Sequence, residues 1–348
     1  MKLERSRAAR WATGACAALS VVIASGCGTS GAGKSDDEGK RPRTKLVTAL
    51  SHVQDTRLTR DWIEFGDVAG VRSRSGDGSG AQRDPLLGYG ESRLADAAAL
   101  LPGLAGIDPF AARSALSVGQ APDPVGVLYG SFDTTSIGAK LRKLGYAKHD
   151  LAGGETAWII RDHHKIDEKD PLAQLGIPTA LNVVRVSPRR IVYGGASADL
   201  DQALTGTEPL ADNEAVGRIA DCLGEVEAAR IGLDPATAET PLGIGVLGSS
   251  GGDATEAVCM TTASRDAAEA IASAWPGRVR STTSRLSDEP WSKLLTQPRA
   301  KVIGGPSHVV RLTARPTGST RVLFDAWTAK DLGPLLTGAE PDPATSAR

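Results

Sequence analysis

Two apolar runs, NVVRV at 182–186 and IVYGG at 191–195, are separated only by the polar turn Ser187–Arg190. β-Branched residues on both sides of a short turn predict a β-hairpin, whose strands are antiparallel. Elsewhere apolar residues recur at helical spacing, as at Ile137 and Leu141. Hairpins and helices therefore occur without regular strand–helix alternation. This mixture predicts an α+β fold with mixed or antiparallel sheets and packed helices.

Two blocks of the chain share one local order. Each has a strand-like run, then a Ser-x-Asp triplet (Ser131–Asp133 and Ser264–Asp266), then an amphipathic helical pattern and further strands. A diverged duplication would explain this order and would make two related halves. Alternatively, Ser and Asp are simply common helix caps. The turn-rich segment 205–213 is the candidate boundary between the blocks.

Three further segments have readable patterns. Residues 108–116 predict a short helix capped by Asp108. The segments 308–316 and 320–327 flank the turn Pro316–Ser319, and we expect them to pair as a hairpin.

The N-terminus has the features of an export signal. Residues 1–10 carry four basic side chains and one acidic one, residues 11–23 are uncharged and mostly apolar, and small residues follow. The apolar run is shorter than the roughly 20 residues that a membrane span needs. The signal region contains no Arg-Arg pair, so we expect the general secretion route.

The segment Ala24–Cys27 resembles the lipobox of bacterial lipoproteins. In that family the signal is cut before the Cys and its thiol carries a diacylglycerol. The resemblance implies that Cys27 is lipidated and that the protein is anchored on the extracytoplasmic face of the cell membrane. Ala24 stands where Leu is usual, with Ile23 one place early. The alternative is an ordinary secreted protein cut near the same place.

The chain has 28 arginines and 12 lysines, a ratio typical of GC-rich bacterial genomes such as those of actinobacteria.

Residues Gly28–Ser35 match the phosphate-loop pattern G-x-x-x-x-G-K-[ST]. That loop needs a strand before it and a helix after it. Here the export signal precedes it, and residues 36–45 have no apolar face. We therefore expect a flexible tether on the order of 25 Å long, and no cofactor.

These features predict a division of the chain. We expect a signal peptide at 1–26, a lipidated Cys and tether at 27–45, α+β domains at 46–205 and 206–336, and a disordered tail at 337–348.

Composition limits the partners. Cleavage before Cys27 would leave 36 basic residues (40 − 4) and 40 acidic ones (41 − 1), a formal charge of −4 without a basic patch. We therefore expect no nucleic-acid partner. Aromatic residues make up 4% of the chain, which disfavours a sugar groove built from stacked rings.

Four cysteines divide by location. Cys16 lies in the signal and Cys27 in the lipobox, which leaves Cys222 and Cys259. Two cysteines outside the cytoplasm usually pair, so we expect a disulfide between them. The alternative is two separate buried thiols.

The triplet Asp162, His163 and His164 resembles the central motif of the DHH phosphoesterases, where it helps to hold two divalent metals. That family also has an upstream Asp-x-Asp, which this chain lacks. Adjacent residues of an extended strand point to opposite faces, so both histidines would not easily reach one ion. A solvated loop is the simpler interpretation, and we expect no metal.

Residues Gly248–Gly252 match G-x-S-x-G, the nucleophile elbow of serine hydrolases, with Ser250 as nucleophile and His308 as base. An elbow requires a helix after the Ser, but β-branched residues follow and predict a strand. A hairpin turn is the simpler interpretation. Glu64 and Asp67 would point to opposite faces of a strand, so we expect Glu64 on a solvated face or paired with a nearby Arg.

No convincing catalytic set emerges. The leading hypothesis is a lipid-anchored envelope protein that binds a small molecule, a lipid or another envelope protein. The alternatives are an extracytoplasmic serine hydrolase using Ser250 and His308, and a structural subunit of an envelope assembly.

Overall fold

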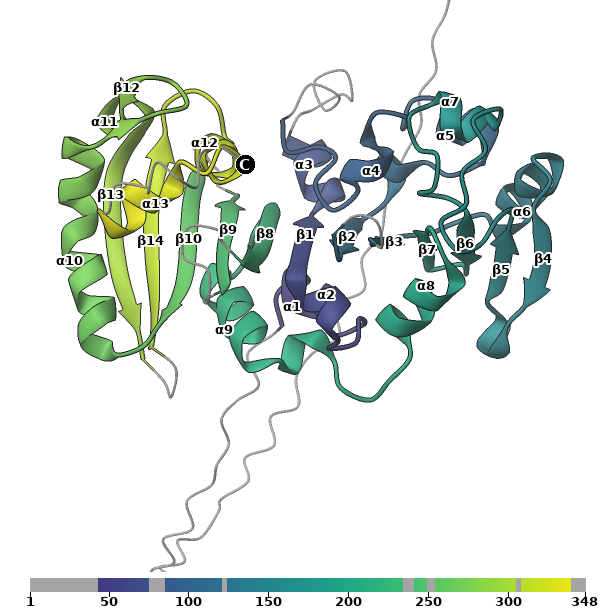
Figure 1. Cartoon of the computed structure of the whole chain (residues 1–348), viewed down its shortest axis with the longest axis horizontal. Coiled ribbons are helices and arrows are strands. Elements are labelled where there is room, and N and C mark those ends of the chain that lie inside the picture. Colours follow the sequence, from purple (N-terminus) through teal and green to yellow (C-terminus); the bar gives the residue numbers. More distant parts are fainter. Residues whose placement is uncertain are drawn as a thin grey trace, which may run out of the picture. The chain divides into compact units, whose positions relative to one another are not determined.

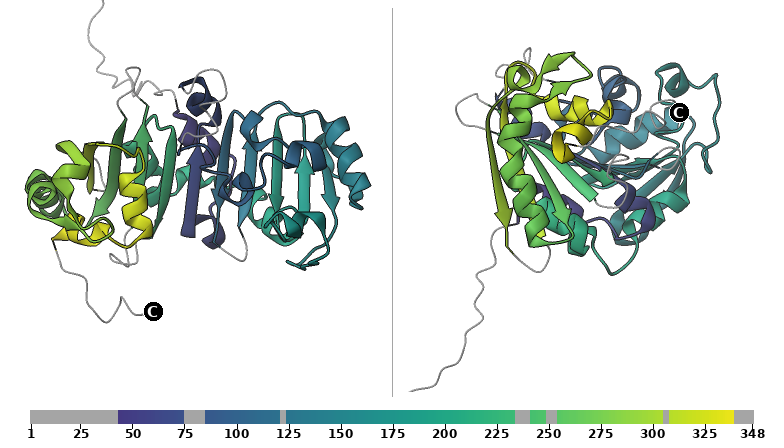
Figure 2. Two further views of the ribbon diagram at one scale, coloured as in Figure 1. Left: turned by 90° about the horizontal axis from the view of Figure 1, so that it is seen from above. Right: turned by 60° about the vertical axis from the view of Figure 1, so that its left-hand side comes forward.

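Antiparallel strand pairing joins most of the described chain into one sheet. The computed structural model describes residues 43–74, 85–120, 124–233, 241–248, 254–304 and 308–338. Twelve strands form a sheet in the order β13-β14-β10-β9-β8-β1-β2-β3-β7-β6-β5-β4, with β11 and β12 as a separate pair. Helices lie on both sides of it (Figures 1 and 2). The predicted α+β class is therefore confirmed.

The strands of the described chain are β1 (Trp62–Gly66), β2 (Ser114–Val118), β3 (Val125–Tyr129), β4 (Ala147–Asp150), β5 (Thr156–Ile159), β6 (Val183–Val186), β7 (Arg190–Gly194), β8 (Ala228–Leu233), β9 (Pro241–Leu247), β10 (Thr255–Thr262), β11 (Thr283–Ser284), β12 (Glu289–Pro290), β13 (Leu295–Ile303) and β14 (His308–Pro316). The α-helices are α1 (Lys45–Leu50), α2 (Arg57–Asp61), α3 (Val68–Arg74), α4 (Ser92–Ala95), α5 (Leu101–Leu104), α6 (Thr134–Lys143), α7 (Pro171–Gln174), α8 (Ser197–Leu204), α9 (Glu214–Leu223), α10 (Arg265–Ser281), α11 (Trp291–Leu294), α12 (Val322–Thr328) and α13 (Leu332–Thr337).

One face of the sheet packs on a continuous core. Ile63 and Phe65 of β1, two residues apart, join the same buried cluster as residues of α1, α8 and α9. Alternate residues of a strand point to opposite faces. Glu64, between them, therefore lies on the other face of the sheet.

The other face is covered by two separate cores. One lies over β9, β10 and β14 and includes residues of α10, α12 and α13. The second lies over β3, β6 and β7 and includes residues of α6 and α7. The strands between them, β8, β1 and β2, carry polar side chains on this face, and the candidate functional site lies there.

The topology repeats one connectivity. Strands β1-β2-β3 form a meander, α6 follows, and the chain returns in β7 beside β3. Strands β8-β9-β10 form a second meander, α10 follows, and β14 returns beside β10. The order of strands and helix expected of two related halves is therefore present. The helix caps differ, because the Asp of the first Ser-x-Asp triplet (Asp133) caps α6 and the Ser of the second (Ser264) caps α10. One sheet crosses the expected boundary at 205/206, and the two-domain division stays a prediction.

The hairpin between β6 and β7 is confirmed. Val186 pairs with Ile191. The hydroxyl of Ser187 accepts a hydrogen bond from the backbone N–H of Arg190 at 3.2 Å, which closes the turn.

Two expectations are wrong. Residues 320–327 do not form the second strand of a hairpin, because α12 covers most of them; β14 pairs with β13 instead. Leu323 and Trp327, one helical turn apart, are both buried, so the apolar face is helical. The segment 108–116 is helical only over Pro109–Ala111, which Asp108 caps, and then enters β2.

The predicted disulfide between Cys222 and Cys259 is present, with the two Cα atoms 6.0 Å apart. It links α9 to β10 inside the continuous core. Across the described ranges, no helix is long and apolar enough to cross a membrane.

Candidate functional site

A row of polar side chains crosses the middle of the sheet. Strand register places Glu64 of β1 directly opposite Ser117 of β2 on one side and Arg230 of β8 on the other. All three face the gap between the two cores, because their strand neighbours face the continuous core. The row therefore joins one residue of the second half of the chain to two of the first.

Glu64 and Arg230 form a buried ion pair. Nη2 of Arg230 lies 2.8 Å from Oε1 of Glu64, and the Ser92 hydroxyl donates to the other carboxylate oxygen at 2.8 Å. Glu64 is only 5% exposed. Removing one member of a buried ion pair leaves the other charge uncompensated, which is strongly destabilising. Glu64, Arg230 and Ser92 therefore hold one another in place. Nη1 of Arg230 also donates to the Thr328 hydroxyl at 3.0 Å.

Aromatic rings surround the arginine. Its guanidinium carbon lies 4.6 Å from the ring centroid of Trp62, and farther ring contacts reach Tyr89, Phe324 and Trp327. Trp62 and Trp327 meet edge to face at 5.7 Å between centroids. Cation–π attraction over a tryptophan is worth about 0.5–2 kcal/mol, so the rings fix Arg230 from the side that Glu64 leaves open.

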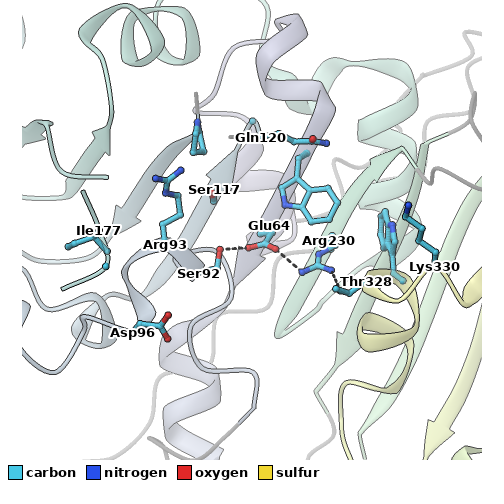
Figure 3. A pocket seen from close by; sticks show the side chains of 15 residues that line it. Glu64, Ser92, Arg93, Asp96, Ser117, Gln120, Ile177, Arg230, Thr328 and Lys330 are labelled. Atoms are coloured by element: carbon cyan, nitrogen blue, oxygen red, sulfur yellow. Dashed lines mark hydrogen bonds and ion pairs between the residues drawn. The ribbon is translucent and has the colours of Figure 1, made fainter. Parts of the chain in front are cut away.

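A cavity of about 760 Å³ opens over this row (Figure 3). Its polar and apolar walls come from both halves of the chain, and its lining residues are Trp62, Glu64, Ser92, Arg93, Asp96, Ser117, Gly119, Gln120, Pro124, Gly176, Ile177, Arg230, Trp327, Thr328 and Lys330. Arg93 lies on one side of the Glu64–Arg230 pair and Lys330 on the other. We call this cavity the central cleft.

A smaller cavity of about 180 Å³ adjoins the same ion pair, since Glu64, Ser92 and Arg230 line both. Tyr89 lines the smaller cavity, and burial raises the pKa of its phenol to about 12. The Tyr89 hydroxyl has no hydrogen-bond partner in the described part of the chain. Nε of Arg230 and Nε of Arg321, two other residues that line this cavity, also have none there, so the Tyr89 hydroxyl is one of three such donors beside it.

The triplet Asp162, His163 and His164 has a structural role. Both histidines adopt left-handed backbone conformations (φ 56°), so the segment is not an extended strand. His163 and residues 165–169 are exposed, which confirms the expected solvated loop. Asp162 accepts the backbone N–H of Ser197 at 2.8 Å, and Nε2 of His164 lies 2.9 Å from a carboxylate oxygen of Asp199. These contacts fasten the turn to the start of α8. No cluster of three or more metal-ligating side chains occurs among the described residues.

The proposed hydrolase pair is not brought together by anything that the structure describes. Ser250 lies outside the described residues. The strands on either side of it pair as a hairpin, with Leu247 opposite Thr255, and no elbow helix begins where β10 does. His308 pairs with Thr262. Thr262 is seven residues along β10 from Thr255, or about 24 Å. Cys27 and the segment Gly28–Ser35 also lie outside the described residues.

Sequence reasoning missed most of the central cleft. For Glu64, pairing with an arginine is confirmed and a solvated face is wrong. Its partner Arg230 is 166 residues away, in a strand that the patterns did not predict. The sequence did contain one indication of this site. Glu64 stands between two large apolar residues of a strand, and this position places its carboxylate close to a hydrophobic core.

Comparisons with known proteins add little. No protein-family model matches the chain, and no curated protein matches it. One solved structure, crystal form IV of TP0453, is similar at 10% identity over 77% of this chain and 92% of its own, with a TM-score of 0.36. At that score the similarity supports no inference about this chain.

Proposed function

We propose that this chain is an exported, lipid-anchored protein of the cell envelope that binds a small ligand in its central cleft. The observation that carries the proposal is the cleft itself. Its volume of about 760 Å³ lies within the roughly 300–1,000 Å³ typical of ligand pockets. Few, well-placed polar groups beside tryptophan rings are also typical of such pockets. Export and anchoring rest on the lipobox-like segment ending at Cys27.

The hydrogen bonds that the polar atoms of the cleft already make favour binding over catalysis. Both carboxylate oxygens of Glu64 already accept hydrogen bonds, from Arg230 and Ser92. Neither histidine nor cysteine occurs among the described lining residues. A general base needs a free acceptor within hydrogen-bond reach of its substrate. The other carboxylate of the lining, Asp96, is exposed to solvent, so the cleft is better equipped to hold a molecule than to move its protons.

Native mass spectrometry of the full chain, extracted from its own membrane in mild detergent, tests this proposal. Thr328 and Thr337 are exposed last residues of α12 and α13, and each hydroxyl donates to the carbonyl four residues earlier. Only Thr328 lines the cleft. Thr328→Trp should therefore block the cleft, and Thr337→Trp is a matched control.

We expect a reproducible added mass on the wild type and on Thr337→Trp, and its loss in Thr328→Trp. A bare mass in all three proteins would contradict the proposal. An added mass that survives in Thr328→Trp would place the ligand elsewhere.

A further inference from the structure

The charged side chains that line the central cleft carry a net positive charge once the Glu64–Arg230 pair is left out of the count. Glu64 and Arg230 neutralise each other at 2.8 Å. The remaining charged lining residues are Arg93, Lys330 and Asp96. Over the described ranges, no ion pair within 4.0 Å involves any of these three. The cleft therefore presents two cations and one carboxylate to an incoming molecule.

Of the two cations, Arg93 says more about the ligand. It is half-buried, and burial lowers the pKa of its guanidinium. Its described side-chain partner is the hydroxyl of Thr179, at 3.2 Å. A partly desolvated guanidinium has up to five N–H donors to satisfy, and a neutral hydroxyl satisfies one. Such a group favours a bidentate acid as partner.

The apolar part of the lining lies beside these cations. Trp62, Trp327 and Ile177 line the same cavity as Arg93 and Lys330. A cationic ligand is disfavoured, because Arg230 already lies over Trp62 at 4.6 Å and would repel a second cation there. A flat, apolar body can still pack against the ring edges and Ile177.

We infer that the central cleft selects a small organic anion with a flat apolar body, such as an aryl carboxylate, sulfonate or phosphate, whose acidic group pairs with Arg93. This inference rests on the proposed function and names the ligand class for the same site. Lys330, on the opposite side of the ion pair, adds positive potential along the cleft (Figure 3).

Two dyes of one scaffold test the charge requirement on the full chain in detergent. 1-Anilinonaphthalene-8-sulfonate carries a sulfonate, and N-phenyl-1-naphthylamine is its neutral counterpart. Both fluoresce on entering an apolar site, so titrations yield a Kd for each. Detergent-only titrations correct for dye in micelles. Thr328→Trp shows whether the dye occupies the cleft.

Arg93→Gln removes the proposed contact, and Arg142→Gln is the matched control. Arg142 is exposed on α6, where it lies 5.5 Å from the ring centroid of Trp158, outside the cleft. We expect Arg93→Gln to raise the Kd of the sulfonate at least about tenfold, the cost of losing a charged hydrogen bond. Arg93→Lys should restore part of the affinity, and Arg142→Gln should change nothing. Circular dichroism melting verifies that each variant is folded.

Two results would overturn the inference. Equal affinity for both dyes, unaffected by Arg93→Gln, would mean a cleft without charge selection; the proposed binding function would stand. If neither dye binds in a manner that Thr328→Trp blocks, the inference also fails, and the native mass spectrum decides the proposed function separately.

Discussion

Glu91 is a carboxyl group whose burial should make stability depend on pH. It is 0% exposed, and neither oxygen has a hydrogen-bond partner within the described ranges. Burial, with a smaller contribution from Asp108, raises its pKa from 4.5 to about 8. The folded state therefore binds a proton that the unfolded state releases above about pH 4.5. Stability from this group is complete below pH 4.5 and is lost as pH rises through about 8.

We expect Glu91→Gln to remove this loss. Relative to wild type, its unfolding free energy should rise between pH 5 and pH 9 by on the order of 4 kcal/mol, since each pKa unit corresponds to about 1.4 kcal/mol. Urea unfolding at both pH values measures the difference. Glu168→Gln, at an exposed position, is the control. An identical pH dependence in wild type and Glu91→Gln would show that the carboxyl is solvated.

Single residues of the site were only partly predictable. A carboxylate at position 64 between Ile63 and Phe65 could be seen in the sequence. Its partner could not, because strand register between β1 and β8 decides that Arg230 lies opposite. Register is a property of the assembled sheet rather than of either segment.

At the scale of elements, the disulfide between Cys222 and Cys259 should stabilise the packing of α9 on β10. Its loop of 37 residues corresponds to roughly 3–4 kcal/mol in the chain-entropy model. We expect the double variant Cys222→Ala, Cys259→Ala to lose about that amount in urea unfolding. Reductant should lower wild-type stability by a similar amount and leave the double variant unchanged. Sensitivity of the double variant to reductant would contradict this assignment.

Strong patterns predicted elements well, and weak ones failed. The β6–β7 hairpin and helices α6 and α10 were predicted from apolar periodicity. Strands β4 and β13 were missed because both are sheet edges with polar, exposed residues, and β13 contains Pro298. Such residues protect an edge against further pairing, and they also erase the strand signal. Strands β2 and β8 were missed because small residues dilute their pattern.

At the scale of the whole molecule, the site lies where the two repeated meanders meet. Strands β1 and β8 begin the two meanders and pair with each other. The two separate cores lie over the strands on either side of this join, and the central cleft opens between them. The α+β class followed from local patterns. The position of the cleft did not, because it depends on how the halves associate.

The lipid anchor that we propose at Cys27 would decide where the central cleft works. The basic N-terminus, the apolar run and the small residues before Cys27 predict cleavage and acylation at that cysteine. Cys27→Ser removes the thiol that would carry the diacylglycerol, and the acyl chains supply most of the membrane affinity expected of such a protein. We expect wild type in the membrane fraction and Cys27→Ser in the soluble or secreted fraction, measured by fractionation and immunoblotting. Cys16→Ser, a control within the signal, should fractionate like the wild type. Tight membrane association of Cys27→Ser would show that another part of the chain holds it there.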